Sequence, residues 1–214
     1  MTSVEKFYSG GWITLVVTGA MIGLCFLIRS HYRSVITRLK RLDEVLQNIP
    51  VKADASLGEV DPKQPTAAVL VGSFGGLGIH TLLSVLRAFP NHYKNLLFLS
   101  VGVVDSDTFK GVAEVDALRN RTEQDLRRYV DYAQKLGIPA SSQAAIGTDT
   151  VSEIEDLCRG VSKQFPKVTF FAGQLIFQKE TWYHRLLHNE TAFAIQKRLH
   201  WSGMTMVILP VRVY

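Results

Sequence analysis

Glycines gather in one short stretch of the sequence, directly after an apolar run. Residues 69–81 read VLVGSFGGLGIHT, with glycines at Gly72, Gly75, Gly76 and Gly78. A strand, a glycine-rich turn and a helix in this order can hold a phosphate, because the free N–H groups at the helix start attract anions. Gly76 and Gly78 match the first two glycines of the dinucleotide fingerprint, with Thr81 where the third belongs.

Two interpretations of this loop remain open. In the first, the loop binds a nucleotide, and Asp105 at the end of the next apolar run binds its ribose. In the second, a strand-to-helix turn needs glycine only for a positive φ angle. No Lys-Ser/Thr pair follows the loop, which excludes a P-loop.

The elements around the loop alternate between short apolar runs and longer helical patterns. We predict strands over 66–73, 94–104, 141–147, 167–173 and 204–213, and helices over 77–89, 111–137, 149–165 and 180–201. Strands separated by helices of this length pair in parallel. The fold class is therefore α/β, a five-stranded parallel doubly wound sheet.

Ligands of doubly wound sheets bind beyond the carboxyl ends of the strands, where the strand order reverses. Several small or acidic residues are expected at such ends. They form the candidate ligand-binding set: Gly72, Ser73, Gly76, Gly78, Asp105, Gly147 and Gly173. We expect no bound cofactor, and a nucleotide is the only alternative that this set suggests.

No catalytic or metal-binding set stands out. Ser73 has no neighbouring acid–base pair to activate it, and His184 and His188 share a helical spacing but have no third ligand. We expect no enzyme activity and no metal. The two cysteines, Cys25 and Cys158, form no framework or CxxC motif, which suits a reducing compartment.

The first part of the chain has the pattern of a membrane helix. Gly11 to Ile28 carries no charge and as a helix is about 27 Å long, close to the thickness of the bilayer core. We predict a transmembrane helix over 1–29. The basic residues come only after it, as Arg29, Arg33, Arg38, Lys40 and Arg41, and place the following chain in the cytoplasm.

The next segments connect this helix to the domain. Residues 30–49 carry apolar side chains at spacings of three and four, which predicts an amphipathic juxtamembrane helix, either packed on a partner or the membrane or serving as a stalk. Residues 50–65 are polar and bracketed by Pro50 and Pro65, as in a linker. The α/β domain then covers 66–214.

Charge argues against nucleic acid as a partner. The net charge is +5, and the five basic residues after the membrane helix account for all of it. The rest of the chain is balanced and predicts no basic face with interleaved aromatic residues.

Two stretches carry a family resemblance. EKFYSGGWITLVVTGAMIGLCFLIRSHYR resembles the last membrane helix of bacterial permeases of the amino acid–polyamine–organocation superfamily, and Lys6-Phe7 with Gly10-Gly11-Trp12 is also similar to related potassium-uptake permeases. The five-strand domain resembles the universal stress proteins, a fold that some of these permeases carry as a cytosolic tail.

The resemblance implies a function. It implies the C-terminal portion of a secondary transporter for amino acids or cations in the inner membrane, whose cytosolic domain serves regulation or assembly. Its partners would be the bilayer, the transporter core and a second copy of the domain. ATP-binding universal stress proteins carry an acid after strand 1, where this chain has Gly72-Ser73, and a glycine pattern after strand 4, where it has Gly173-Gln-Leu-Ile. The alternative function is a membrane-anchored nucleotide sensor of the universal-stress type.

Overall fold

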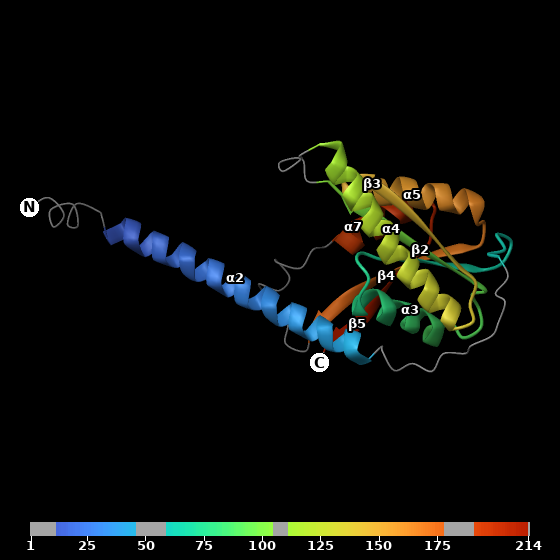
Figure 1. The fold of residues 1–214 in the computed structure, drawn as a ribbon, viewed down its shortest axis with the longest axis horizontal. Helices are drawn as coiled ribbons and strands as arrows, with labels where there is room; N and C mark the ends of the chain where they lie inside the picture. The colour runs from blue at the N-terminus through green and yellow to red at the C-terminus, as the bar shows by residue number, and fades with distance from the viewer. Residues whose placement is uncertain (1–11, 46–58, 105–110, 178–190, 214) are drawn as a thin grey trace, which may run out of the picture. The chain divides into compact units, whose positions relative to one another are not determined.

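The structure is a computed structural model that describes residues 12–45, 59–104, 111–177 and 191–213. The chain divides into two compact units, residues 1–41 and 42–214 (Figure 1). Most of helix α2, Trp12–Val45, belongs to the first unit, and the helix continues past Ser30 without a break. One stretch of α2, Trp12–Ser30, has the length and composition of a membrane span, with a mean hydropathy of 1.9 and no residue buried. The predicted apolar stripe of residues 30–49 lies outside the described side chains.

The second unit contains one parallel sheet of five strands in the order β3-β2-β1-β4-β5. The strands are β1 (Thr66–Leu70), β2 (Asn95–Val103), β3 (Ala140–Gly147), β4 (Val168–Phe177) and β5 (Met206–Val213). The chain builds outward from β1 to β3 and then returns to add β4 and β5 on the other side. The order reverses between β1 and β4, so the predicted doubly wound sheet is confirmed.

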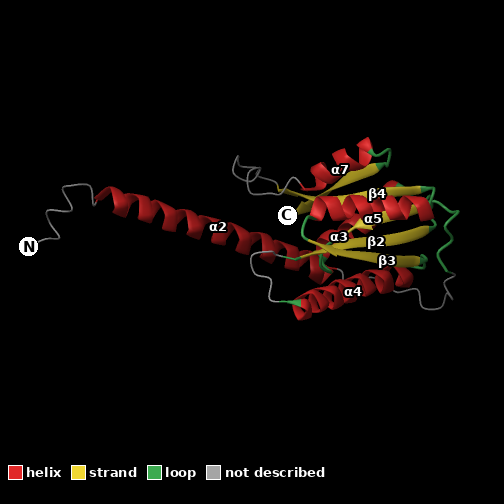
Figure 2. Cartoon of the chain, turned by 90° about the horizontal axis from the view of Figure 1, so that it is seen from above, coloured by secondary structure: helices red, strands yellow, loops and turns green. Residues whose placement is uncertain are grey.

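Among the described residues, four helices cover the two faces of this sheet (Figure 2). They are α3 (Gly76–Ala88), α4 (Val112–Lys135), α5 (Thr150–Gln164) and α7 (Thr191–Trp201). Residues 178–190, which begin the predicted fourth helix and include His184 and His188, lie outside the described residues.

Alternate residues of the central strand β1 point to opposite faces. Ala67 and Val69 pack under α3 and α4 in one buried cluster, which also holds Phe98, Tyr129 and Phe171. Ala68 packs under α5 and α7 in the other, which also holds Leu97, Cys158 and Phe170. Strands buried on both faces read as continuous apolar runs, as β1 and β2 do here.

The segment before β1 belongs to the domain. Val60 packs against the core under α5 and α7. The buried Asn95 amide donates hydrogen bonds to the Asp61 carbonyl at 2.6 Å and to Thr66 Oγ1 at 3.1 Å. Residues 59–65, which the sequence predicted as linker, are thus fixed to the sheet.

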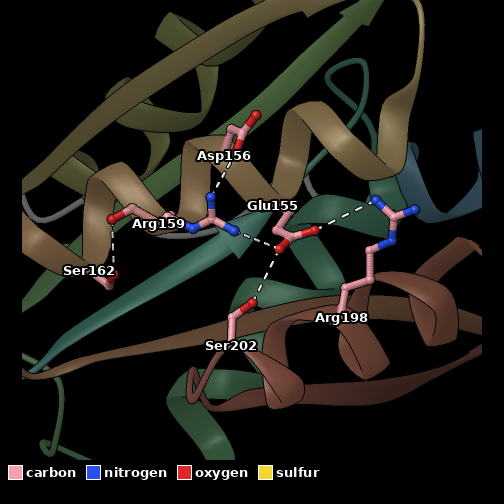
Figure 3. Close-up of polar contacts among 6 residues, drawn as sticks. All are labelled: Glu155, Asp156, Arg159, Ser162, Arg198 and Ser202. Carbon is pink, nitrogen blue, oxygen red and sulfur yellow. Dashed lines mark hydrogen bonds and ion pairs between the residues drawn. The ribbon is translucent and has the colours of Figure 1, made fainter.

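A polar cluster joins α5 to α7 (Figure 3). Glu155 on α5 accepts from Arg159 at 2.7 Å and from the Ser202 hydroxyl at 3.1 Å, and its second oxygen lies 3.6 Å from Arg198 on α7. One carboxylate therefore holds the last helix against its neighbour.

Candidate functional site

The glycine loop lies at the carboxyl end of β1, and Tyr129 of α4 holds it in place. The Tyr129 hydroxyl donates to the Ser73 carbonyl at 3.1 Å and accepts from the Gly75 N–H at 3.2 Å. Its ring packs against Phe74 and stacks on Phe98. A fully buried aromatic side chain thus satisfies two backbone groups of the loop.

Close packing explains Gly78. A Cβ at Gly78 would overlap the phenol of Tyr129, whose ring is fixed in the core. The glycine is needed so that α4 can place an aromatic ring against the first turn of α3.

Positive φ does not explain the loop's glycines. Among described glycines, positive φ occurs at Gly111, Gly137 and Gly203, none of which is in this loop. The interpretation that the turn needs glycine for its φ angle is therefore wrong. Gly75 at the helix N-cap is extended, with φ of 179°, and Gly72 has open space around its Cα.

Gly173 lies on β4, the neighbour of β1 opposite β2, and it also allows close packing. We expected it at the end of its strand, but β4 continues to Phe177, because Gln174 to Phe177 pair with Pro210 to Val213 of β5. A Cβ at Gly173 would overlap Thr81 Oγ1 of α3.

This contact relates to the dinucleotide fingerprint, whose third glycine lets helix and strand approach closely. Here the helix carries Thr81 at that position and the strand carries the glycine. The close approach is kept with the small residue moved to the facing strand.

A pocket of about 190 Å³ lies at the carboxyl ends of β1 and β2. Its walls come from the glycine loop, the end of β2 and α4. The polar lining residues are Ser73, Ser100, Arg121, Thr122 and Asp125. Small-molecule sites usually measure about 300–1,000 Å³, so the space bounded by the described residues is small for a nucleotide.

The pocket contains charges of both signs on one helix. Arg121 is exposed and makes no ion pair or hydrogen bond within the described part of the chain. The Asp125 carboxylate lies 3.9 Å from Arg128, at the outer limit of an ion pair, and Arg128 in turn lies over the Phe74 ring. Thr122 donates to the Leu118 carbonyl at 2.9 Å. The arrangement offers binding groups for a small polar molecule but no nucleophile paired with a base.

The structure brings only part of the predicted set together. Gly72 and Ser73 line the pocket, and Gly76 and Gly78 lie behind it in the first turn of α3. Gly147 ends β3, paired with Val103, and a Cβ there would meet the Glu153 carboxylate. Asp105 lies outside the described residues. Within the described ranges, no group of His, Cys, Asp and Glu could hold a metal ion.

Sequence reasoning missed the contribution of α4. Leu118, Thr122, Asp125 and Tyr129 recur at spacings of three and four along the helix and face the ends of β1 and β2. The sequence predicted a helix here, but none of its side chains was assigned to the ligand-binding set. The polar residues Thr122, Asp125 and Tyr129 on one face of the helix were the sequence signal that could have identified this contribution.

Comparisons with known proteins found similarity only among solved structures. No protein-family model and no curated protein matches the sequence. Among solved structures, the chain is similar to a universal stress protein from Archaeoglobus fulgidus, at 11% identity and a TM-score of 0.48, covering 68% of this chain and 93% of that one. A universal-stress-family protein from Burkholderia pseudomallei matches at 15% identity and a TM-score of 0.45, covering 67% and 96%.

A third match is a universal stress protein from Lactobacillus plantarum, at 14% identity and a TM-score of 0.41, covering 68% and 98%. All three of these structures are described as universal stress proteins or as members of that family. The assignment of the fold stands on the strand order and on the helices of the two faces.

Proposed function

We propose that this chain is the C-terminal, membrane-anchored portion of a secondary transporter for amino acids or cations, and that its α/β domain regulates or assembles the transport core. The observation that carries the proposal is the apolar stretch Trp12–Ser30, whose side chains find no burial in the chain itself. A helix of this kind needs lipid or a membrane partner. The described residues of the domain that follows offer a binding pocket without a nucleophile paired with a base.

The proposal fixes topology and partners. We propose that the domain lies in the cytoplasm at the inner membrane, because basic residues follow the span and such residues favour the cytoplasmic side. The partners are the bilayer, the membrane core of the transporter and a second copy of the domain, which would meet at the edge strand β5. Neither catalysis nor nucleic-acid binding belongs to the proposed function.

A single helix cannot provide alternating access, because that mechanism uses a site between repeated helix bundles near the midplane. The purified chain in liposomes should therefore give no amino-acid or potassium uptake above empty vesicles. Saturable uptake by the chain alone would contradict its role as an accessory to a transport core.

The direct test removes the domain in the native cell. Residues 59–214 are deleted while the span is kept, and uptake of amino acids and potassium is compared with the parent, with the amount of transport core followed by immunoblot. We expect uptake to change for one substrate class. Unchanged uptake of every substrate, with unchanged core, would refute the regulatory and assembly roles together.

The second candidate is a membrane-anchored sensor of the universal-stress type, and the pocket beside Ser73 favours it. The size of the pocket and the tyrosine behind the glycine loop argue against tight ATP binding. Thermal-shift titration of the full chain with ATP should show no stabilisation at millimolar nucleotide. A shift worth about 2.7 kcal/mol, equivalent to a Kd near ten micromolar, would favour the sensor instead.

A further inference from the structure

One edge of the sheet gathers basic side chains that lie far apart in the sequence. All five strands are parallel, so the connections that enter the strands meet at their amino ends. The domain helices return to the same edge and end there. We call this surface the amino edge, and its cations are Lys63, Arg87, Lys94, Lys135, Lys163, Lys167 and Lys197.

These cations are exposed and available for an external partner. Each has an exposed side chain, and none makes an ion pair within the described residues. The acids at the same edge are fewer. They are Glu59, Asp61 and Asp131, together with Glu155 beside the end of α7, which is paired with Arg198 and Arg159. These cations are far apart in the sequence, so the order of residues along the chain does not predict a basic face. They come together only because all the strands are parallel and begin at the same edge of the sheet.

Helix ends explain only some of these residues. Arg87, Lys135 and Lys163 lie in the last turns of their helices, where a cation interacts favourably with the helix dipole. Lys94 and Lys167 stand in connections that lead into strands, where no such interaction requires them. The edge therefore carries more positive charge than helix capping explains.

An exposed tryptophan completes the surface. Trp201, the last residue of α7, is 80% exposed, and the Lys197 ammonium lies 5.0 Å from its ring centroid. Tryptophan rings beside lysines are typical of membrane interfaces, where the ring lies at headgroup level and the cation meets phosphate.

The chain enters the domain at this same edge. Thr66 begins β1 and pairs with Asn95 and Val168, the first residues of β2 and β4. Residues 59–65 precede it and are fixed there by Asn95. The covalent connection to the candidate membrane span is thus made at the basic edge.

We propose that the amino edge binds the anionic lipid headgroups of the membrane in which α2 is anchored, with Trp201 inserted at the interface. The identity of the membrane rests on the proposed function, whereas the affinity for anionic lipid rests on the edge alone. Basic residues near an anionic bilayer are attracted over about a Debye length, so the contact should weaken as salt rises.

The test uses the full chain in vesicles and reads each membrane contact with its own tryptophan. A Trp201-only variant carries Trp12→Phe and Trp182→Phe, and a Trp12-only variant carries Trp182→Phe and Trp201→Phe. Both are reconstituted in phosphatidylcholine vesicles, with and without phosphatidylglycerol, with brominated acyl chains as quencher. We expect quenching of Trp201 to be at least about twofold stronger with phosphatidylglycerol and to be lost at high salt. Trp12 should be quenched in both lipids.

Charge variants separate the edge from general attraction. Lys163→Glu with Lys167→Glu should abolish the additional quenching of Trp201. Arg119→Glu with Arg127→Glu, the same change of charge on exposed positions along α4, should leave it intact. Equal effects of the two pairs would overturn the assignment to the amino edge.

The remaining outcomes decide between the two proposals. If Trp12 but not Trp201 is quenched in anionic vesicles, the proposal that the amino edge binds lipid is overturned, while the proposal that α2 spans the membrane is supported. Quenching of Trp201 without Trp12 would overturn the anchor and support the docking, and quenching of neither would overturn both. If duplex DNA at stoichiometric amounts displaced Trp201 from the vesicles, the edge would belong to nucleic acid and the lipid proposal would fail.

Discussion

At the start of α3, the space that Gly78 leaves free is filled by the phenol of Tyr129. The two residues are far apart in sequence, and neither identifies the contact alone. The glycines suggest a phosphate-binding loop because a bound phosphate must approach the backbone closely. A packed aromatic ring has the same steric requirement, since a side chain at the glycine position would block it. In this protein the ring of Tyr129 occupies that space.

Substitutions in this loop should separate packing from flexibility. We expect Gly78→Ala to lower the free energy of unfolding by about 1–3 kcal/mol, because the methyl group would overlap a fixed ring. Gly72→Ala should change it by less than about 0.5 kcal/mol, since nothing lies near its Cα and its φ is not positive. Urea unfolding of both variants checks this, and equal losses would show that the loop needs glycine for another reason.

Two tyrosines one turn apart on α4 form a matched pair. Tyr129→Phe removes the hydroxyl that serves Ser73 and Gly75, and should cost about 1–3 kcal/mol. The Tyr132 hydroxyl is buried with no hydrogen-bond partner in the described part of the chain, and its pKa is raised by burial. Tyr132→Phe should therefore leave stability unchanged or raise it. A larger loss for Tyr132→Phe than for Tyr129→Phe would contradict the hydrogen-bond assignment.

Cys158 should make stability depend on alkaline pH. Burial on the side of α5 that faces the sheet raises the pKa of its thiol to about 12, from 9.0. The folded state keeps the thiol protonated, so its contribution is complete below pH 9 and is lost between about pH 9 and pH 12. The free energy of unfolding of the wild type should thus fall more steeply over this window than that of Cys158→Ala. Chemical denaturation of both at several pH values measures the difference, and parallel curves would refute it.

At the scale of the elements, the sequence predicts most of the domain. Strands such as β1 and β2 are apolar runs bounded by polar residues, and helices such as α4 carry a clear helical period. The end of β4 could not be predicted, because Gln174 to Phe177 become strand only through their pairing with β5.

The site was less predictable than the elements that hold it. Ser73 and Gly72 were placed correctly at a strand end, because local sequence decides where β1 stops. The roles of Gly78 and Gly173 depend on Tyr129 and Thr81, and such partners follow from tertiary packing alone. Arg121 and Asp125 look like any exposed pair until the ends of β1 and β2 are seen opposite them.

The carboxylate between α5 and α7 gives a prediction at this scale. Glu155→Ala removes the acceptor shared by Arg159, Arg198 and Ser202 and should destabilise the domain by about 1 kcal/mol. Asp156→Ala removes one more exposed ion pair on the same helix and should cost less. Hydrogen exchange should show that Glu155→Ala loosens α7 selectively. Equal protection of α7 in both variants would show that apolar packing alone holds the helix.

For the whole molecule, the two buried clusters both lie within residues 59–214 and include no residue of α2. A fragment of residues 59–214 should thus be soluble and unfold cooperatively. A fragment of residues 66–214 should be less stable by about 1–3 kcal/mol, because the Asn95 amide loses its acceptor at Asp61. Thermal unfolding of the two fragments, followed by circular dichroism, gives the comparison. Identical midpoints would show that residues 59–65 do not stabilise the domain and belong to the linker.

The length of chain between the span and the sheet has a consequence for how tightly the domain must bind. With α2 anchored in a bilayer as proposed, the helix beyond Ser30 and the 13 residues between Val45 and Glu59 reach at most about 70 Å from the membrane. One domain confined to a half-sphere of that radius has an effective concentration on the order of 1 mM at the membrane surface. A lipid contact with a dissociation constant in the millimolar range would then be occupied about half of the time. Small changes in salt or in lipid charge would be enough to switch it.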